Sequence, residues 1–477
     1  MSRKLFAVTT ALILSALCLP LAAQQADAEV EPQAAPAANA AQQSPPPQAG
    51  QKRAAPKPRP PEDPAKLEED SRAAYADGDY MKFYIANLKL HKQMPYVPQY
   101  MINLVRACAL LEKYNTAYHY MFKMQQQGLS FDFNSTDDTE SIRGTQAYDY
   151  INNLMIEAGQ AAGEGSVLAT LPGAPQDYAS IAWDPSRERL LLGTLREGKL
   201  LAVGADGNSE LLLQASDTNE LWSITGIAVD ADNNRLWLST TASPAFDRLS
   251  PADRNRAALV ELELDELKEL NRYYAPVDAL HHELGAVSRA TDGNVYVIDT
   301  MSPVVYRKAP EADRLEPFVA SNQLVGFTDL VVTPDNSRLF VADPVMGVFL
   351  VDPREKSAAM LSADDNLNLG GIDGIDFADG KLFIVQGGLS PQRLMRIELD
   401  PAGLAAAVVS PMAIALEPFN WPRLAAHGAG ALYYIANQGE GSEEDGAIVM
   451  RTPLDAGSEI QPPNIDDLKR ALQAPPQ

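Results

Sequence analysis

Residues 330–344 read LVVTPDNSRLFVADP, two apolar stretches separated by the turn residues Asp335-Asn336-Ser337. Apolar runs of this length on either side of an Asp/Asn/Gly turn predict a β-hairpin. The pattern occurs six times, and its copies begin at Ile181, Ile227, Ala286, Leu330, Ile375 and Leu424, at spacings of 46, 59, 44, 45 and 49 residues. Such a period with several strands per unit is typical of a β-propeller. We therefore predict a mainly β fold with a six-bladed β-propeller over residues 166–456, closed by an outer strand at residues 166–171.

A helical segment precedes the propeller. Apolar residues recur at helical spacing over residues 65–165, with breaks at Asp77-Gly78-Asp79, Pro95 and Gly128. The segment also matches itself at a separation of 34 residues, pairing Ala74, Tyr80, Tyr84 and Leu88 with Cys108, Tyr114, Tyr118 and Phe122. This period resembles tetratricopeptide repeats. A small tetratricopeptide-like domain has two interpretations, a groove for a peptide partner or a cap packed on the propeller.

The N-terminus has the pattern of an export signal. Arg3 and Lys4 precede an apolar run over residues 5–23, and residues 26–28 (Ala-Asp-Ala) provide a small-x-small cleavage site. We expect residues 1–28 to be removed and the protein to be periplasmic or secreted, the alternative being a retained membrane anchor. No other stretch reaches the roughly 18 consecutive apolar residues of a membrane helix.

Low-complexity segments flank the predicted domains. Residues 29–64 contain ten Pro and nine Ala. A segment with so few large apolar side chains cannot offset its ordering entropy by burial, which predicts a disordered linker. Residues 457–477 are assigned as a C-terminal tail.

The charge balance excludes some classes of partner. The chain has 39 Lys and Arg against 63 Asp and Glu, a net charge of −24. Sequence-independent nucleic-acid binding requires clustered cations that displace counterions, and binding to anionic lipid surfaces requires basic patches. We expect neither kind of partner.

The repeats resemble the senescence marker protein/gluconolactonase family, with NHL-type propellers as more distant relatives. The passage that carries this resemblance best is GIDGIDFADGKLFIVQGGLSPQRLMRIELDP, residues 371–401. The resemblance implies a divalent cation, calcium or zinc, at the channel mouth, held by an Asp, a Glu and an Asn from different blades. Carried onto this sequence, the Asp falls on Asp373, whereas the Glu falls on Ala179 and the Asn on Thr328. A rebuilt metal site would combine Asp373 with Asp177.

Other side chains near the predicted channel mouth are candidates for chemistry. His281 and His282 precede the third blade and are weak candidates, with Asp373, for acid–base or metal work. Thr225, Thr328, Asn420 and Trp421 precede the inner strands of three blades and are candidate ligand-binding residues.

Three functions fit these observations. The first is an exported soluble binding protein with a small-molecule or protein ligand at the channel mouth, favoured because two of the family's three metal ligands are missing. The second is a metal-dependent, lactonase-like hydrolase acting on lactones or esters. The third is a protein–protein scaffold that uses the helical repeats. Whether the chain is an enzyme stays open, with binding favoured.

Overall fold

The computed structural model describes residues 62–276, 281–320, 325–364 and 366–457. The predicted export signal, all but the last residues of the predicted linker, and the tail beyond Gly457 lie outside these ranges. The described helices and strands belong to one compact unit. Among the described residues, no helix is long and apolar enough to cross a membrane.

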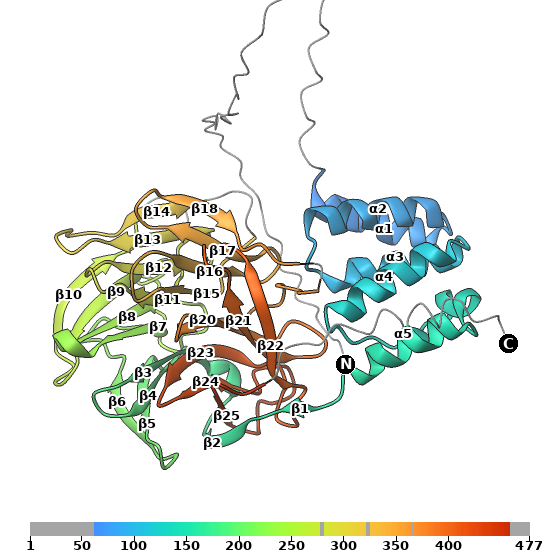
Figure 1. Ribbon diagram of the computed structural model, residues 1–477. Coiled ribbons are helices and arrows are strands. Elements are labelled where there is room, and N and C mark those ends of the chain that lie inside the picture. Colours follow the sequence, from blue (N-terminus) through green and yellow to red (C-terminus); the bar gives the residue numbers. More distant parts are fainter. Residues whose placement is uncertain (1–61, 277–280, 321–324, 365, 458–477) are drawn as a thin grey trace, which may run out of the picture. The chain divides into compact units, whose positions relative to one another are not determined.

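Six antiparallel sheets form a six-bladed β-propeller in the described part of the chain, which confirms the predicted fold (Figure 1). In chain order, the first four blades are β3–β6 (Tyr178–Asp184, Arg189–Thr194, Lys199–Val203, Ser209–Gln214), β7–β10 (Ser223–Asp230, Arg235–Thr241, Ala257–Glu263, Glu269–Tyr274), β11–β14 (Leu284–Arg289, Val295–Asp299, Val304–Lys308, Glu316–Ala320) and β15–β18 (Asp329–Val332, Leu339–Asp343, Gly347–Asp352, Ser357–Met360). The fifth contains β19–β22 (Gly374–Ala378, Lys381–Gln386, Arg393–Leu399, Ala406–Ile414), and the sixth contains β23–β25 (Arg423–Gly428, Ala431–Ile435, Ala447–Pro453) with β2 (Ser166–Leu171).

Burial along each blade explains the sequence pattern. The second strand of a blade is covered by neighbouring blades on both faces, so β16 is buried at every residue and reads as a continuous apolar run. The outer strand β18 is exposed throughout. At the hairpin turns, Asn234 and Asn336 adopt the left-handed backbone conformation, with φ of 54° and 56°. This conformation is tolerated by Asn better than by most residues, so the turn chemistry that identified the repeats is also what shapes them.

The ring closes through the first and last strands of the propeller. β2 pairs antiparallel with β25, placing Ser166 opposite Arg451 and Leu171 opposite Ala447. The predicted role of residues 166–171 is therefore confirmed. One detail was not predicted: the two-residue strand β1 (Ala162–Gly163) adds to the outer edge of β22 as a fifth strand.

The N-terminal helices repeat with the spacing found in the sequence. They are α1 (Pro64–Ala76), α2 (Tyr80–Gln93), α3 (Pro98–Leu110), α4 (Tyr114–Gln126) and α5 (Gln146–Glu157). The starts of α1 and α3, and those of α2 and α4, are each separated by 34 residues. The side chains of Asp63 and Asp79 accept a backbone N–H in the first turns of α1 and α2 and so cap both helices. The relation to tetratricopeptide repeats stays a prediction.

The helices pack on the propeller near the fifth blade. Leu389, from the loop after β20, is buried in the same hydrophobic cluster as helix residues such as Met101 and Met121. The backbone N–H of Ser130 donates to the carbonyl oxygen of Ser390 at 2.8 Å. These contacts fix the helices against the fifth blade of the propeller.

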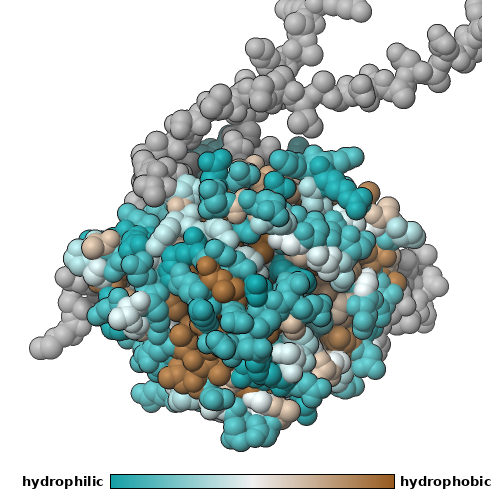
Figure 2. All heavy atoms as spheres, turned by 90° about the vertical axis from the view of Figure 1, so that its left-hand side faces the viewer, coloured by the Kyte–Doolittle hydropathy of each residue, from teal (hydrophilic) through white to brown (hydrophobic). Residues whose placement is uncertain are grey.

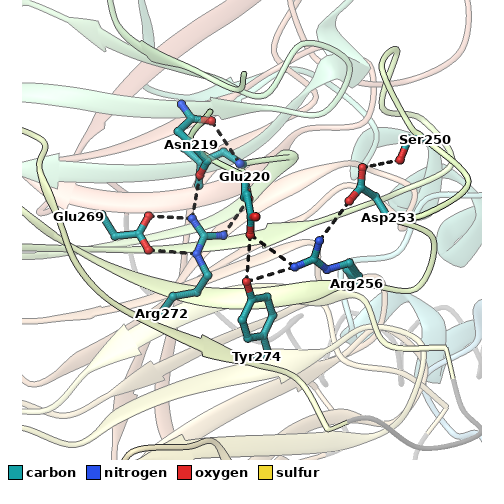
Figure 3. A network of polar contacts seen from close by, with 9 residues as sticks. Asn219, Glu220, Ser250, Asp253, Arg256, Glu269, Arg272 and Tyr274 are labelled. Carbon is teal, nitrogen blue, oxygen red and sulfur yellow. Dashed lines mark hydrogen bonds and ion pairs between the residues drawn. The ribbon is translucent and has the colours of Figure 1, made fainter. Parts of the chain in front are cut away.

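Polar networks satisfy charged groups on the outer edge of the second blade (Figure 3). Arg272 forms two hydrogen bonds with Glu269, at 3.0 and 2.7 Å, and another with the carbonyl oxygen of Glu220. Arg256 contacts both the Glu220 carboxylate and the Tyr274 hydroxyl. Glu220 has a left-handed backbone, with φ of 46°, so this network holds a strained loop. Its members bind one another, which marks it as structural.

The face of the molecule shown in Figure 2 is predominantly hydrophilic, and its apolar residues form separate small patches. The most promising place for a ligand is instead the channel between the blades.

Candidate functional site

The inner strands of the six blades surround a central channel. β3, β7, β11, β15, β19 and β23 all contribute to its wall, and its volume is about 1010 Å³. This is large enough for a small organic molecule, because ligand pockets commonly enclose about 300–1,000 Å³. Thr225, Thr328, Asp373 and Trp421 lie on these strands or in the loops just before them.

Side chains bridge the inner strands of successive blades. The Thr225 hydroxyl donates to the carbonyl oxygen of Leu284 at 2.5 Å, and the Thr328 hydroxyl donates to that of Ile372 at 2.9 Å. Other bridges among the described residues join Ser180 to Ile224, Ser288 to Val332, Asp329 to Ile375, Asp376 to His427, and Gln438 to Tyr178. Inner strands have an unpaired edge facing the channel, and these bonds satisfy part of it. Thr225 and Thr328 do line the channel, but their hydroxyls already donate these hydrogen bonds between neighbouring inner strands.

An ion pair and an aromatic side chain lie together before the inner strands of the last two blades. The Nε atom of Arg423 lies 3.5 Å from Oδ1 of Asp373, whose side chain is 10% exposed. Trp421 is 44% exposed. Both Asp373 and Trp421 lie over Gly387: a Cβ atom there would be 3.0 Å from Cδ1 of the indole and 3.1 Å from Oδ2 of the carboxylate. We call Asp373, Trp421 and Arg423 the mouth cluster.

The backbone of this loop is strained. Trp421 and Leu424 have φ of 64° and 65°, in the left-handed region that β-carbon sterics disfavour. The backbone N–H of Trp421 donates to Oε1 of Gln392 at 3.0 Å. Residues held in an unfavourable backbone conformation by their neighbours are concentrated at functional sites. The conformation of Trp421 therefore makes its exposed indole a candidate for ligand binding.

Burial and neighbouring charges set the ionisation of the mouth carboxylates. Burial raises the pKa of Asp373, opposed by the charge of Arg423 and a hydrogen bond from the Trp421 side chain. Asp329, on β15, accepts the backbone N–H groups of Ile375 and Leu330 at 2.9 and 2.8 Å. Burial nevertheless raises the pKa of Asp329 to about 7. The channel wall therefore contains a carboxyl group that exchanges its proton near neutral pH.

Two other candidates from the sequence, Asp177 and Asn420, form hydrogen bonds within the protein. The Asp177 carboxylate accepts the backbone N–H of Arg196 at 2.6 Å, and Asp177 is not among the described residues that line the channel. Asn420 donates through its amide to the carbonyl oxygen of Glu440 at 3.2 Å, so it fixes its own loop. A metal site that combines Asp177 with Asp373 stays a prediction.

The two adjacent histidines have different surroundings. Nε2 of His281 lies 3.0 Å from Oε1 of Glu283. His282 is 2% exposed, and its Nδ1 lies 2.6 Å from Oδ2 of the buried Asp299. The ring of His282 therefore packs within the third blade.

The predicted metal ligands do not form a cluster. Among the described residues, no group of three or more His, Cys, Asp or Glu side chains is arranged to hold a metal ion. Asp373 has a guanidinium as its charged neighbour. The divalent cation implied by the family resemblance stays a prediction.

Sequence reasoning missed three groups in this channel: Arg423, Asp376 and His427. Each is a polar residue in or beside an inner strand that is otherwise apolar, as in IDFA (375–378) and LAAHG (424–428). A polar residue at a position expected to be buried was therefore the available signal.

Comparisons with known proteins describe the fold. No family profile matches the chain, and no curated protein matches it. Among solved structures, the PQQ-bound aldose sugar dehydrogenase from Streptomyces coelicolor is 17% identical, with a TM-score of 0.43, covering 61% of this chain and 99% of its own. The virginiamycin B lyase from Staphylococcus aureus is 9% identical, with a TM-score of 0.40 and coverages of 62% and 100%. A streptogramin B lyase is 10% identical, with a TM-score of 0.41 and coverages of 61% and 98%. At these identities the likenesses concern the propeller architecture alone.

Proposed function

We propose that this chain is an exported binding protein for small polyhydroxylated ring compounds, with its site at the mouth cluster. The observation that carries the proposal is the juxtaposition of an exposed indole with an ion pair beside a channel of about 1010 Å³; the Asp373 side chain of that pair is 10% exposed and the Arg423 side chain is 42% exposed. The flat face of an indole packs against the C–H face of a saturated ring. The planar carboxylate and guanidinium provide paired acceptors and donors for neighbouring hydroxyl groups.

Two further observations support this proposal over its alternatives. The hydrogen bonds between the inner strands of successive blades hold these strands in place. The mouth cluster is therefore supported by a fixed backbone, as a preformed ligand site requires. The helices are packed on the propeller through Leu389 and the Ser130–Ser390 hydrogen bond, which favours a cap over an independent scaffold. The export signal predicted from the sequence over residues 1–28 supports a periplasmic or secreted location.

Thermal melting of residues 29–477 with glucose, galactose and the acyclic polyol sorbitol tests the proposal. A compound that binds only the folded state raises the melting temperature with increasing concentration. We expect a rise for the ring compounds that is lost in Trp421→Asn, since Asn tolerates the left-handed backbone of this position. Asp373→Asn should weaken the effect.

The matched control is Tyr114→Ala, because Tyr114 is 41% exposed, close to the exposure of Trp421, but lies on α4. It should leave the ligand-induced shift unchanged. No shift with any compound of the panel, or a shift retained in full by Trp421→Asn and Asp373→Asn, would overturn the proposal.

A further inference from the structure

The channel wall changes character between the two ends of the inner strands. The mouth cluster lies where these strands begin. In the described part of the chain, the next-to-last residue of each of the six inner strands also lines the channel: Trp183, Val229, Ser288, Val331, Phe377 and His427. Four of these six residues are large and apolar. We call Trp183, Val229, Val331 and Phe377 the deep ring.

Packing between the blades fixes the deep ring and leaves part of it uncovered. Val229, Trp183 and the pair Val331 and Phe377 each pack on a buried hydrophobic cluster. The ring of Phe377 also stacks on Phe340, with centroids 5.5 Å apart and planes inclined by 19°. All four side chains of the deep ring are nevertheless only half-buried. The channel therefore has a preformed apolar surface at this depth.

The two polar side chains at this depth have partners in the protein. Oγ of Ser288 accepts the backbone N–H of Val332 at 3.1 Å. Nδ1 of His427 lies 2.8 Å from Oδ2 of Asp376, although the His427 side chain is 44% exposed.

Charged side chains along the wall are also engaged with one another. Nη2 of Arg289 lies 2.9 Å from Oδ1 of Asp230. Asp329 interacts electrostatically with both Asp376 and Arg423, so the charges between the mouth cluster and the deep ring form one connected network. Apart from the imidazole of His427, the surface that the channel offers to a ligand at the deep level is therefore mainly apolar.

The passage between the mouth cluster and the deep ring is lined by small side chains. Ala286 and Ala425 line the channel two residues before Ser288 and His427. His427 lies four residues after Arg423 on β23, about 13 Å along an extended strand. The channel volume of about 1010 Å³ is at the upper end of the range for ligand pockets. A ligand bound at the mouth cluster therefore has room to extend down to the deep ring.

We propose that the ligand is amphiphilic, a polyhydroxylated ring that carries an apolar substituent such as an alkyl chain. The ring contacts the mouth cluster, and the substituent extends along the channel to the deep ring. This inference rests on the proposed function, because it assigns a further group to a ligand already placed at the mouth cluster. The hydroxyl groups fix the orientation of the ligand, and removal of the substituent from water adds affinity.

Isothermal titration calorimetry of residues 29–477 with methyl, butyl and hexyl glucoside, below micelle-forming concentrations, tests the inference. Each CH₂ group that is fully removed from water contributes about fourfold in affinity. We therefore expect Kd to fall steadily with chain length, by about tenfold or more from the methyl to the hexyl compound. The heat capacity change of binding should become more negative along the series, because more apolar surface is buried.

A substitution in the deep ring tests where the chain binds. Val331→Thr replaces a methyl group by a hydroxyl group at nearly constant volume, and a polar group that loses water on ligand binding is unfavourable. It should reduce the ratio of the hexyl to the methyl affinity by about threefold or more. Val167→Thr is the matched control, because Val167 is 52% exposed on the outer strand β2, and it should leave this ratio unchanged. If Val331→Thr fails to fold, Val229→Thr provides the same test.

The outcomes separate this inference from the proposed function. Methyl and hexyl affinities within about twofold of each other, both lost in Trp421→Asn, would refute the amphiphilic ligand and leave the ring-binding proposal standing. A gain with chain length that folded Val331→Thr and Val229→Thr both retain in full would also refute it. Hexane-1,2-diol probes the chain alone. Binding of this diol as tight as that of hexyl glucoside, or no binding of any glucoside, would contradict both proposals.

Discussion

Nη1 of Arg393 donates a hydrogen bond of 2.8 Å to the carbonyl oxygen of Gln127, which joins β21 of the propeller to the C-terminal end of α4. The same nitrogen donates to the carbonyl oxygen of Gly128, and Nε donates to Oε1 of Gln386 at 2.8 Å. Arg393 is 2% exposed, and burial lowers its pKa to about 10. The partial negative charge at the end of a helix stabilises a cation placed there, so α4 helps to keep this guanidinium charged.

Replacing Arg393 should loosen the helices from the propeller. Arg393→Met would fill much of the same space but leave the carbonyl oxygens of Gln127 and Gly128 without their buried donor. Unpaired buried acceptors cost about 1–3 kcal/mol each, so the two carbonyl groups together predict a loss of about 2–6 kcal/mol in the free energy of unfolding. Denaturant unfolding measures this loss. Arg314→Met is the control, because the Arg314 side chain is 75% exposed, and an equal effect of both variants would contradict the prediction.

The contact between Arg393 and Gln127 also shows where sequence reasoning stops. The hairpin repeats have a strong local signal, since their turns and apolar runs are dictated by neighbouring residues, and the blades follow from it. Arg393 and Gln127 are separated by 266 residues, and nothing near either of them in the sequence indicates the other. The same holds for Asp376 and His427, which approach each other only because successive blades place their inner strands side by side. Trp421 could be selected from the sequence, but its strained backbone could not.

The buried carboxyl group of Asp329 should make stability depend on pH. Its pKa is raised from 3.8 to about 7, so between pH 4 and 7 the native state holds a proton that the unfolded chain releases. Stability from this group is therefore present at low pH and is lost as the pH rises through about 7. Asp329→Asn removes the titration and retains an oxygen to accept the Ile375 N–H.

Melting temperatures at a series of pH values measure this effect. At pH 8 the Asp329→Asn variant should melt above the unaltered protein, and the difference should diminish toward pH 4. A constant difference across this range would show that Asp329 does not titrate as described.

Closure of the ring predicts that the propeller does not fold without its last four strands. A chain ending at Asp400 lacks β22 to β25 and leaves β2 without its partner β25. Open sheet edges expose unpaired backbone groups and promote aggregation. We expect residues 29–400 to be insoluble or to lack a cooperative melting transition by circular dichroism, in contrast to residues 29–477. A soluble fragment with a sharp transition would argue against the closed ring.

Close packing at the seam between the last and first blades predicts a large effect of a single methyl group. A Cβ atom on Gly428 would lie less than 3.0 Å from three atoms of the Trp183 ring. That ring is stacked on Tyr433, with centroids 5.4 Å apart and planes inclined by 6°, so it has little room to withdraw. Forcing extra volume into a packed core costs about 1–3 kcal/mol, and we expect Gly428→Ala to lose that much free energy of unfolding in denaturant unfolding.

Gly326 provides the control. No described atom lies within 4 Å of a Cβ added at this position. Gly326→Ala should therefore leave stability unchanged or raise it slightly, because alanine restricts the unfolded chain. Equal stabilities of the two variants would show that the Trp183–Tyr433 stack yields to the added methyl group.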